Sequence, residues 1–359
     1  MTTVATTIPH SRPSIDEEDL RATAEVLRSG QVAQGPYVER FEQAMAGFLG
    51  LQGGVAVSSG TAALELALRA LRIGPCDEVI MPSYVCSAPW LATQRVGAEA
   101  RLVDIDLQTF NIDPVAAGRA VTSKTRAIIV PHLFGLPADL TAFERLGVPL
   151  IEDCAQTLGV TESGRPVGTV GRLTVCSFYA TKLLCAGEGG MVLSNDCALL
   201  DRVRSLREYD GATKLDPSSF NLKLTDLQAA LGLSQLGRFE SFQERRCVLA
   251  ATYREALSGK ALFMPSVPPG RTHGYYRFTV RIPHFKTDPD ALHGLIRTLE
   301  QQGVSCRKPV FRPLHRYLDQ SGFPNSDEAD RTVLSIPLYP DLADEEVRQI
   351  RQSLAEVLS

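Results

Sequence analysis

The chain has 359 residues and a formal net charge of −4, and 44% of its residues are hydrophobic while 22% are charged. These proportions are ordinary for a folded globular protein, and the length is sufficient for two domains. Because the 41 acidic and 37 basic residues are interspersed along the chain, we expect no basic surface for a nucleic acid or an anionic membrane.

The eight cysteines are scattered singly, without a C-x-x-C pair or a Cys/His cluster at zinc spacing. His273, His284, His293 and His315 also lie far apart, outside any ligand pattern. The sequence therefore predicts reduced thiols and no bound metal. The chain has no basic n-region with a long apolar core and no run of ~18 apolar residues. We expect a cytoplasmic protein without a membrane span.

Short apolar and β-branched runs alternate with helical patterns from about residue 13 to 240. This alternation predicts right-handed crossovers and a mostly parallel sheet. The run at 127–130 is apolar without alternation, as in a strand buried on both faces. Strands are predicted at 54–57, 78–82, 100–103, 126–130, 149–151, 173–177 and 190–194, and helices at 62–71, 225–236 and 238–257.

The pattern changes after about residue 240. A long helix is followed by a Pro-rich stretch at 264–270, an alternating run at 276–281, a helix near 290–301 and a terminal helix from Asp344. We therefore expect a large α/β domain over residues 1–240, with an N-terminal arm, and a smaller α+β domain over residues 241–359. The aromatic cluster at 275–278 is expected to pack the smaller domain.

The string SSGTAAL at residues 58–64 follows a predicted strand and opens a predicted helix. Small residues let the backbone approach an anion, and the free N–H groups and the dipole of a helix start attract negative charge. Gly60, Thr61 and Ala62 can therefore cradle a phosphate. The same string is also an ordinary helix cap, so alone it does not decide between the two functions.

The string IEDCAQTLG at residues 151–159 places Asp153 at the end of an apolar strand. In open α/β sheets, ligands bind beyond the carboxyl ends of the strands. A carboxylate there can keep a pyridinium nitrogen protonated and strengthen the ring as an electron sink. Gln156 can hydrogen-bond a ring substituent. The alternative is that Asp153 merely caps the next turn.

The string SFYATKLLCAGEGGMV at residues 177–192 is the most informative stretch, because Lys182 stands between a strand and a Gly-rich return. Lysines usually lie on solvated faces. Lys182 has apolar and small neighbours, and desolvation can lower the pKa of a lysine enough for it to attack an aldehyde. Ser177 can reach the same phosphate as residues 60–62. Glu188 either positions a substrate or stabilises the Gly turn.

These three strings occur in the order and spacing seen in the DegT/StrS-like sugar aminotransferases, which are pyridoxal phosphate (PLP) enzymes of fold type I. The similarity extends to GPCDEVIMPS at 74–83, PHLFG at 131–135, NLKLTDLQAA at 221–230 and LSIPLYP at 334–340. The chain therefore resembles this family over nearly its whole length. The resemblance implies a large domain like that of aspartate aminotransferase and a smaller C-terminal domain.

The resemblance also implies site residues. Lys182 matches the lysine that forms the Schiff base and carries the proton, and Asp153 matches the partner of the pyridine nitrogen. Asn221 matches an asparagine that reaches the phosphate from the neighbouring subunit, which implies a homodimer with a shared active site. The remaining cofactor contacts are Gln156 beside the phenolic oxygen of the ring, and Gly60, Thr61, Ala62 and Ser177 around the phosphate.

Two positions depart from the family pattern. Many members have a ring that stacks on the cofactor where this chain has Cys86, and an arginine where it has Lys223. Stacking then falls to Tyr84 or Trp90, or is weaker. His132 follows a predicted strand and is either a substrate contact or a loop-packing residue. Candidate substrate contacts are Tyr84, Cys86, Glu188, Lys308 and His315, with Tyr209, Lys214 and Arg307 in the surrounding loops.

By this resemblance, the chain transfers an amino group from glutamate or glutamine to a keto-sugar, such as a nucleotide-linked 3- or 4-keto-deoxysugar, in amino-sugar biosynthesis. Two half-reactions predict ping-pong kinetics. The alternatives are amination of a keto-cyclitol of the scyllo-inosose type, or a non-catalytic regulator that keeps the fold. Relatives that dehydrate deoxysugars have histidine in place of Lys182. A nucleotide cofactor has little support, since neither dinucleotide nor P-loop glycine motif is present.

Overall fold

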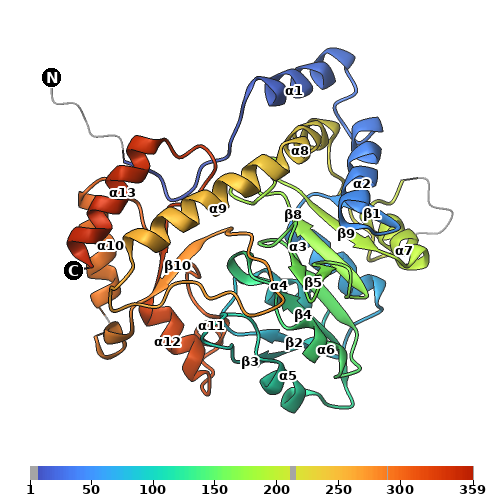
Figure 1. Ribbon diagram of the computed structural model, residues 1–359. Helices are drawn as coiled ribbons and strands as arrows, with labels where there is room; N and C mark the ends of the chain where they lie inside the picture. The colour runs from blue at the N-terminus through green and yellow to red at the C-terminus, as the bar shows by residue number, and fades with distance from the viewer. Residues whose placement is uncertain (1–6, 211–215, 289, 359) are drawn as a thin grey trace.

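A seven-stranded sheet forms the centre of the computed structural model, which describes residues 7–210, 216–288 and 290–358 (Figure 1). The strand order is β1-β9-β8-β5-β4-β2-β3. The pairs β2–β3, β2–β4, β4–β5 and β5–β8 are parallel, which confirms the predicted mostly parallel sheet. The strands are β1 (Gly53–Val57), β2 (Glu78–Pro82), β3 (Glu99–Val103), β4 (Thr125–Pro131), β5 (Leu150–Asp153), β8 (Leu173–Ser177) and β9 (Gly190–Ser194).

Strand β9 runs antiparallel to both of its neighbours, β8 and β1. Parallel neighbours need a crossover connection, whereas antiparallel neighbours can be joined by a return of the chain. Residues 178–189 make this return between β8 and β9 without a helix. The Gly-rich segment around Lys182 therefore lies at the edge of the sheet where β8 ends.

Both faces of the sheet are buried, because successive side chains of a strand point to opposite faces. Val55, Val57 and Ile129 belong to the core on one face, whereas Ala56 and Ile128 belong to cores on the other. The helices of this part of the chain are α1 (Glu17–Ser29), α2 (Pro36–Leu49), α3 (Gly60–Ala70), α4 (Ala88–Arg95), α5 (Pro114–Ala120), α6 (Leu140–Glu144), α7 (Cys197–Arg207) and α8 (Asp226–Gly237), with a 3-10 turn at η1 (Leu133–Gly135).

The C-terminal part of the chain has a core of its own, built around Tyr253, Phe278, Leu299 and Ile350. In Figure 1, the gold helix α9 runs from α8 toward the orange and red elements. Two antiparallel strands, β10 and β11, pack in this core. The elements are α9 (Phe239–Ala256), β10 (Phe278–Arg281), η2 (Pro283–Thr287), α10 (Ala291–Gln301), α11 (Leu314–Tyr317), α12 (Pro324–Thr332), β11 (Val333–Ile336) and α13 (Asp344–Val357).

This arrangement confirms the α/β fold class with a smaller C-terminal α+β unit. The boundary at residues 240 and 241 stays a prediction. Val310 and Leu314, which follow that boundary, pack in the core of the central sheet. The C-terminal part therefore contributes to both cores.

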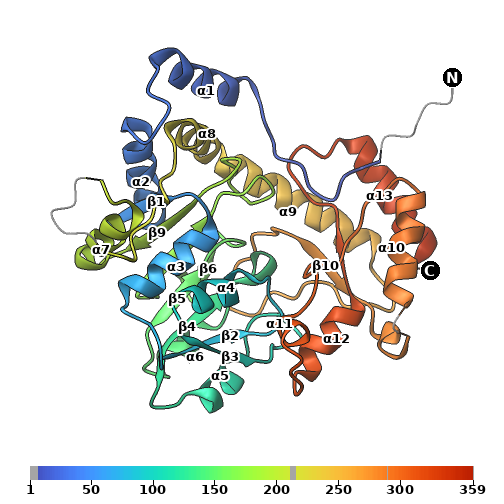
Figure 2. The same cartoon turned by 180° about the vertical axis from the view of Figure 1, so that it is seen from behind.

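The N-terminal segment joins the two parts of the molecule. Ile8 pairs in parallel with Val304, donating its N–H to Gly303 O at 2.8 Å. Further along, Ser14 O accepts from Gln235 Nε2 of α8 at 2.7 Å. Figure 2 shows the blue segment running from the region of α13 to α1. Within the described residues, no helix is long and apolar enough to span a membrane.

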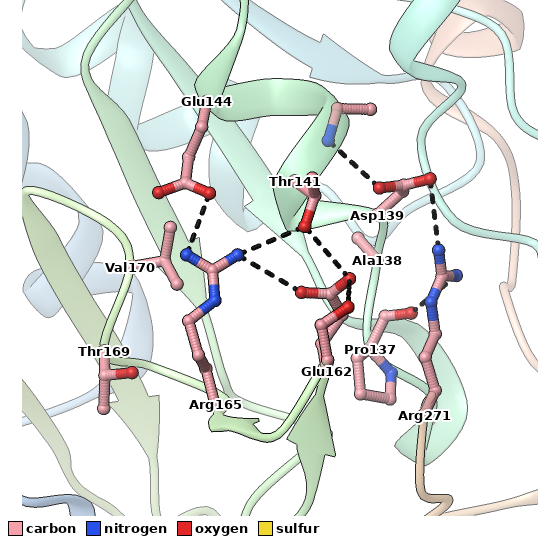
Figure 3. Close-up of polar contacts among 12 residues, drawn as sticks. Pro137, Ala138, Asp139, Thr141, Glu144, Glu162, Arg165, Thr169, Val170 and Arg271 are labelled. Carbon is pink, nitrogen blue, oxygen red and sulfur yellow. Dashed lines mark hydrogen bonds and ion pairs between the residues drawn. The ribbon is translucent and has the colours of Figure 1, made fainter. Parts of the chain in front are cut away.

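A short hairpin, β6 (Thr161–Glu162) and β7 (Arg165–Pro166), leaves the sheet and contacts α6. Arg165 forms an ion pair with Glu144 at 2.9 Å and another with Glu162 at 3.4 Å (Figure 3). Glu162 also makes a β-bridge to Arg271. Through these contacts the hairpin fixes the segment that follows residue 270 against the large part of the molecule.

Candidate active site

The predicted cofactor residues meet at the carboxyl edge of the parallel strands. Asp153 is the last residue of β5 and pairs with Val175 of β8, which itself ends at Ser177. Lys182 lies in the return that follows. Its backbone N–H donates to Tyr179 O at 2.8 Å, and Ala180 N donates to Gly187 O at 2.9 Å, so the return is held by its own hydrogen bonds.

Lys182 is half-buried, and its Nζ lies 5.2 Å from the centre of the Tyr276 ring. The cluster at 275–278 is expected from the sequence to pack the smaller domain. For Tyr276 this prediction is wrong, because its ring packs in the core that contains Phe178 and Leu183. Tyr275 and Phe278 do pack in the C-terminal core. The sequence does not separate the two cases, because an aromatic residue next to the start of a strand has the same pattern whichever core its ring packs in.

Asp153 is buried, with 8% of its surface exposed. Its Oδ1 accepts from Ala155 N at 3.0 Å, so one oxygen does cap the following turn. Its Oδ2 has no hydrogen-bond partner among the described residues. Burial raises the pKa of Asp153, while the Ala155 N–H and the charge of Lys182 act against this. The free oxygen and the raised pKa fit a carboxylate whose cationic partner is a ligand.

Cys86 lies near Lys182 and Asp153, whose charges act on its thiol. Its side chain is open to solvent but lies deep enough that loss of bulk water raises its pKa, and the positive charge of Lys182 is the largest effect in the other direction. Asp153 also acts on Cys86. Lys182, Asp153 and Cys86 therefore lie close enough for their charges to act on one another.

The start of α3 and the end of β8 form a cradle. A Cβ atom on Gly60 would lie 2.8 Å from Ser177 Cβ, so only glycine fits there. Ala62 N donates to Ser59 Oγ at 3.1 Å. The N–H groups of Gly60 and Thr61 find no acceptor in the described part of the chain. Two of the three predicted N–H groups are thus available to an anion beside the Ser177 hydroxyl.

Asn221 lies next to this cradle on an extended segment. Ser58 N donates to Leu222 O at 2.8 Å, and Lys223 bridges to Val57. The Asn221 side chain is exposed. A cavity of about 350 Å³ lies beside it, lined by residues of the helix start, including Ser59 and Thr61, and by residues 217–220.

Gln156 is held by the turn at η1. Its Oε1 accepts from Phe134 N at 3.0 Å, which leaves the amide N–H groups as its donors. Phe134 has a φ of 60°, and Gly135 follows with a φ of 102°. The orientation of the amide is therefore fixed by the fold, with its hydrogen atoms free for a partner.

His132, Glu152 and Cys154 form a buried group whose ligand atoms lie within 4.8 Å of one another. His132 Nδ1 accepts from Ala138 N at 3.0 Å, so the proton is on Nε2, which donates to Glu152 Oε2 at 3.1 Å. No lone pair of the His132 ring is left for a metal. Burial also raises the pKa of the Cys154 thiol. We interpret the group as structural, with His132 packing the loop.

The remaining substrate candidates divide by accessibility. The Tyr84 ring is fully buried, 6.4 Å from each of the Phe110 and Phe134 rings, and Trp90 packs beside the core. Lys308 pairs with Asp330, and His315 bonds Ser83 and Asp327 through its two ring nitrogens. Glu188 and Cys86 have exposed side chains, as do Tyr209 and Arg307, and Lys214 lies outside the described residues.

A large cavity, of about 1220 Å³, opens at the opposite edge of the sheet. It is lined by Leu150, Arg172 and Asn195, close to where β5 and β8 begin. None of the predicted site residues lines it. Cavity size therefore does not identify the candidate site here, whereas the unpaired polar atoms do.

Comparison with known proteins gives the same assignment as the geometry. The sequence model of the DegT/DnrJ/EryC1/StrS aminotransferase family matches residues 13–355, and the chain belongs to this family. The predicted family and enzyme class are thereby confirmed.

Three relatives illustrate the similarity. The chain is 33% identical to the spore coat polysaccharide biosynthesis protein SpsC of Bacillus subtilis (strain 168), over 98% of this chain and 97% of that protein. It is also 33% identical to a pleiotropic regulatory protein of Geobacillus stearothermophilus, over 94% of both chains. A putative sugar aminotransferase of Streptococcus pneumoniae in its PMP form superposes with a TM-score of 0.92 at 26% identity, covering 98% of this chain and 97% of that one. That protein is also known in PLP and apo forms.

Proposed function

We propose that this chain uses PLP to move an amino group from glutamate or glutamine to a keto-sugar, specifically a nucleotide-linked 3- or 4-keto-deoxysugar. The observation that carries the proposal is the meeting of Lys182, Asp153 and the Gly60–Ser177 cradle at one edge of the sheet. Membership of an aminotransferase family supports the reaction type.

The residues present fit PLP. The cradle offers two N–H groups and the Ser177 hydroxyl to a phosphate, and a side chain on Gly60 would fill it. The unpaired Oδ2 of Asp153 suits a protonated ring nitrogen, and the amide N–H groups of Gln156 suit a ring oxygen. When bound, PLP supplies an aldehyde for the lysine and an electron sink for the substrate carbon.

Lys182 has two tasks in this proposal. It would hold the cofactor covalently, and when its amino group is free, Nζ would take a proton from the donor carbon and deliver it to C4′ of the cofactor. Asp153 keeps its negative charge because a cation offsets the cost of its burial. The fixed Oε1 of Gln156 keeps the amide from turning its acceptor toward the ring oxygen.

The acceptor and the assembly rest on the relatives and on Asn221. The names of the Streptococcus pneumoniae and Bacillus subtilis proteins connect them with sugars and polysaccharide, which supports a sugar acceptor. Asn221 is exposed, so its side chain is accessible to a second subunit. We therefore include a homodimer with shared active sites in the proposal.

The decisive experiment combines a spectrum with an acceptor screen. The purified chain should show a visible band with PLP, and borohydride should fix the cofactor mass on the peptide that contains Lys182. Nucleotide-linked keto-sugars, free keto-sugars and keto-cyclitols are then offered with glutamate or glutamine. Turnover of only the keto-cyclitol would replace the sugar in the proposal. A coloured protein that aminates no acceptor would favour a regulator, as the Geobacillus relative suggests.

A further inference from the structure

Tyr276 comes from the C-terminal part of the chain, yet its ring lies against the lysine loop of the large part. It is 5% exposed, and the ring lies 5.2 Å from Lys182 Nζ and 4.9 Å from the Arg277 guanidinium. A cation within about 6 Å of an aromatic face is attracted by the electrons of the ring. Lys182 therefore has an aromatic partner that the cofactor chemistry does not require.

The backbone around Tyr276 is held from two sides. Gly274 N donates to Gly135 O at 2.7 Å, and Arg277 N donates to Phe134 O at 3.2 Å. A Cβ atom on Gly135 would lie 2.5 Å from Tyr275 N, so the two segments approach as closely as glycine permits. The same η1 turn is held by the side chain of Gln156. The position of Tyr276 is therefore linked to a residue of the cofactor site.

On the other side, the buried Arg246 donates to the carbonyl oxygens of Tyr275 and Tyr276, at 3.3 and 3.4 Å. Just before this segment, Arg271 forms an ion pair with Asp139 at 3.3 Å and donates to Pro137 O (Figure 3). These contacts are made to backbone and carboxylate groups of both parts of the molecule. They fix where the Tyr276 ring lies before any ligand binds.

The positive charges around the ring act on the Tyr276 hydroxyl. The Tyr276 hydroxyl accepts from Arg277 Nη2 at 3.4 Å. Burial alone would raise the pKa of Tyr276, but the positive charges of Lys182, Arg277 and Arg246 and a hydrogen bond with the Thr181 side chain lower it to about 8. Lys182 Nζ itself lies over the ring face, 5.2 Å from the ring centre.

We propose that Tyr276 is a positioning residue, which receives the amino group of Lys182 on its ring face whenever that lysine is not bonded to the cofactor. The inference rests on the proposed function, in which the amino donor displaces Lys182 in every catalytic cycle. A free lysine has many rotamers. A fixed aromatic face limits these rotamers and keeps Nζ near Asp153 and Cys86, where the lysine must act again.

Two substitutions separate the ring from the hydroxyl. Tyr276→Phe keeps the ring, whereas Tyr276→Leu removes it and keeps the site apolar. Tyr275→Leu makes the same change one residue earlier, where the ring stacks on His273 at 4.1 Å instead of facing Lys182. Thermal unfolding of each full-length variant checks that it is folded. If Tyr276→Leu does not fold, Tyr276→Met takes its place in the same comparison.

The first readout needs no cofactor. The full chain, stripped of PLP, is treated with acetic anhydride at neutral pH, and acetylation of Lys182 is followed by peptide mass spectrometry. Loss of the ring removes a contact that favours the charged amine, so Lys182 should react on the order of tenfold faster in Tyr276→Leu. Tyr276→Phe and Tyr275→Leu should stay near the rate of the unsubstituted chain. Equal rates in all four proteins, or equal acceleration in Phe and Leu variants, would overturn the proposal.

The second readout is the return half-reaction. The PLP-loaded enzyme is aminated with the donor, a keto acid is added, and the reappearance of the visible band is timed. It should be on the order of tenfold slower in Tyr276→Leu and rescued in Tyr276→Phe. If the acetylation rates of the variants follow the expected order but the protein never binds PLP, the proposed function is refuted and the contact between Tyr276 and Lys182 is not. A protein that aminates sugars with equal labelling rates refutes only the role of Tyr276.

Discussion

Two neighbouring carboxylates, Glu152 and Asp153, occupy opposite surroundings on the two faces of strand β5. Glu152 accepts four hydrogen bonds, from Gly168 N and Val170 N at 2.7 Å, Gly171 N at 2.5 Å and His132 Nε2 at 3.1 Å. Asp153 accepts one, from Ala155 N. Burial acts to raise the pKa of both groups, but the pKa of Glu152 is lowered and that of Asp153 is raised.

The number of hydrogen bonds that each group accepts separates a structural carboxylate from one that can bind a ligand. Both carboxylates are buried, so burial does not distinguish them. The number of donors does, since an ionised carboxylate in the interior needs hydrogen bonds or a cation. The fold completes the surroundings of Glu152 by itself. In the proposed function, a cation that lies against its second oxygen completes the surroundings of Asp153.

The largest expected effect concerns Lys182, whose charge acts on Asp153, the carboxylate with an unpaired oxygen. Lys182→Ala should lower amino transfer by roughly 10⁴- to 10⁶-fold, the range seen when a covalent catalytic residue is removed. The free energy of unfolding should change little, because Lys182 makes no ion pair in the described structure. Steady-state turnover and urea unfolding measure the two quantities. A variant that retains a tenth of the activity would refute the covalent role.

Asp153→Asn should lower turnover by about 10²- to 10³-fold, the usual loss when one preorganised electrostatic group is removed. The cofactor-free chain should be as stable as before or slightly more so. The folded pKa of Asp153 is raised, so its native carboxylate is disfavoured above that pKa, and the neutral amide removes this cost. Turnover and denaturant unfolding without PLP test both halves. A marked loss of stability would place Asp153 with the structural carboxylates.

Glu152→Gln should, in contrast to Asp153→Asn, destabilise the fold, with a loss of about 2 to 4 kcal/mol in the free energy of unfolding. An amide presents its own N–H group to N–H donors and leaves some of them unpaired. Because the folded pKa of Glu152 is lowered, the stability it provides is present above its unfolded pKa and lost as the pH falls through the folded pKa. The variant should therefore lose less stability on acidification, as urea titrations at several pH values will measure.

Gly60→Ala should have the smallest effect, a roughly tenfold weaker binding of PLP, or about 1.4 kcal/mol. The added methyl would meet Ser177 Cβ at 2.8 Å, so the cradle must widen. Gly47→Ala in α2 is the matched control, since a Cβ atom there meets nothing within 4 Å. Equilibrium titration with PLP gives the affinities. Equal affinity in the two variants would show that the cradle does not hold the phosphate.

The central sheet could be predicted from the sequence because its strands are buried on both faces. The seven predicted strands all overlap observed ones, as in the run at 126–130 and strand β4. The sequence does not predict the reversed direction of β9, since its composition resembles that of the parallel strands of the sheet. Strands β6 and β7 have two residues each, too few for any period to appear.

The candidate site could be predicted less completely. Asp153 and Ser177 stand at strand ends and Lys182 in the return that follows, where the chemistry of the residue and its place beside the sheet both point to a ligand. Tyr84 and Tyr276 illustrate what is missing, because both are aromatic residues in apolar surroundings. One is enclosed by Phe110 and Phe134, while the other faces Lys182. Only packing between distant segments separates the two.

The N-terminal segment has a consequence for how the molecule is assembled. Ile8 pairs with the backbone of Gly303 and Ser305, so this pairing forms only after residues 303–305 have been synthesised. Residues 11–14 of the same segment line a small cavity together with Lys182 and Arg246. Contacts with residues synthesised late, including the bond from Ser14 to Asp341, therefore also hold the segment that lines the cavity beside Lys182. A ribosome-bound chain that ends before α10 contains the strands of the central sheet and Lys182, but it lacks residues 303–305, which pair with Ile8.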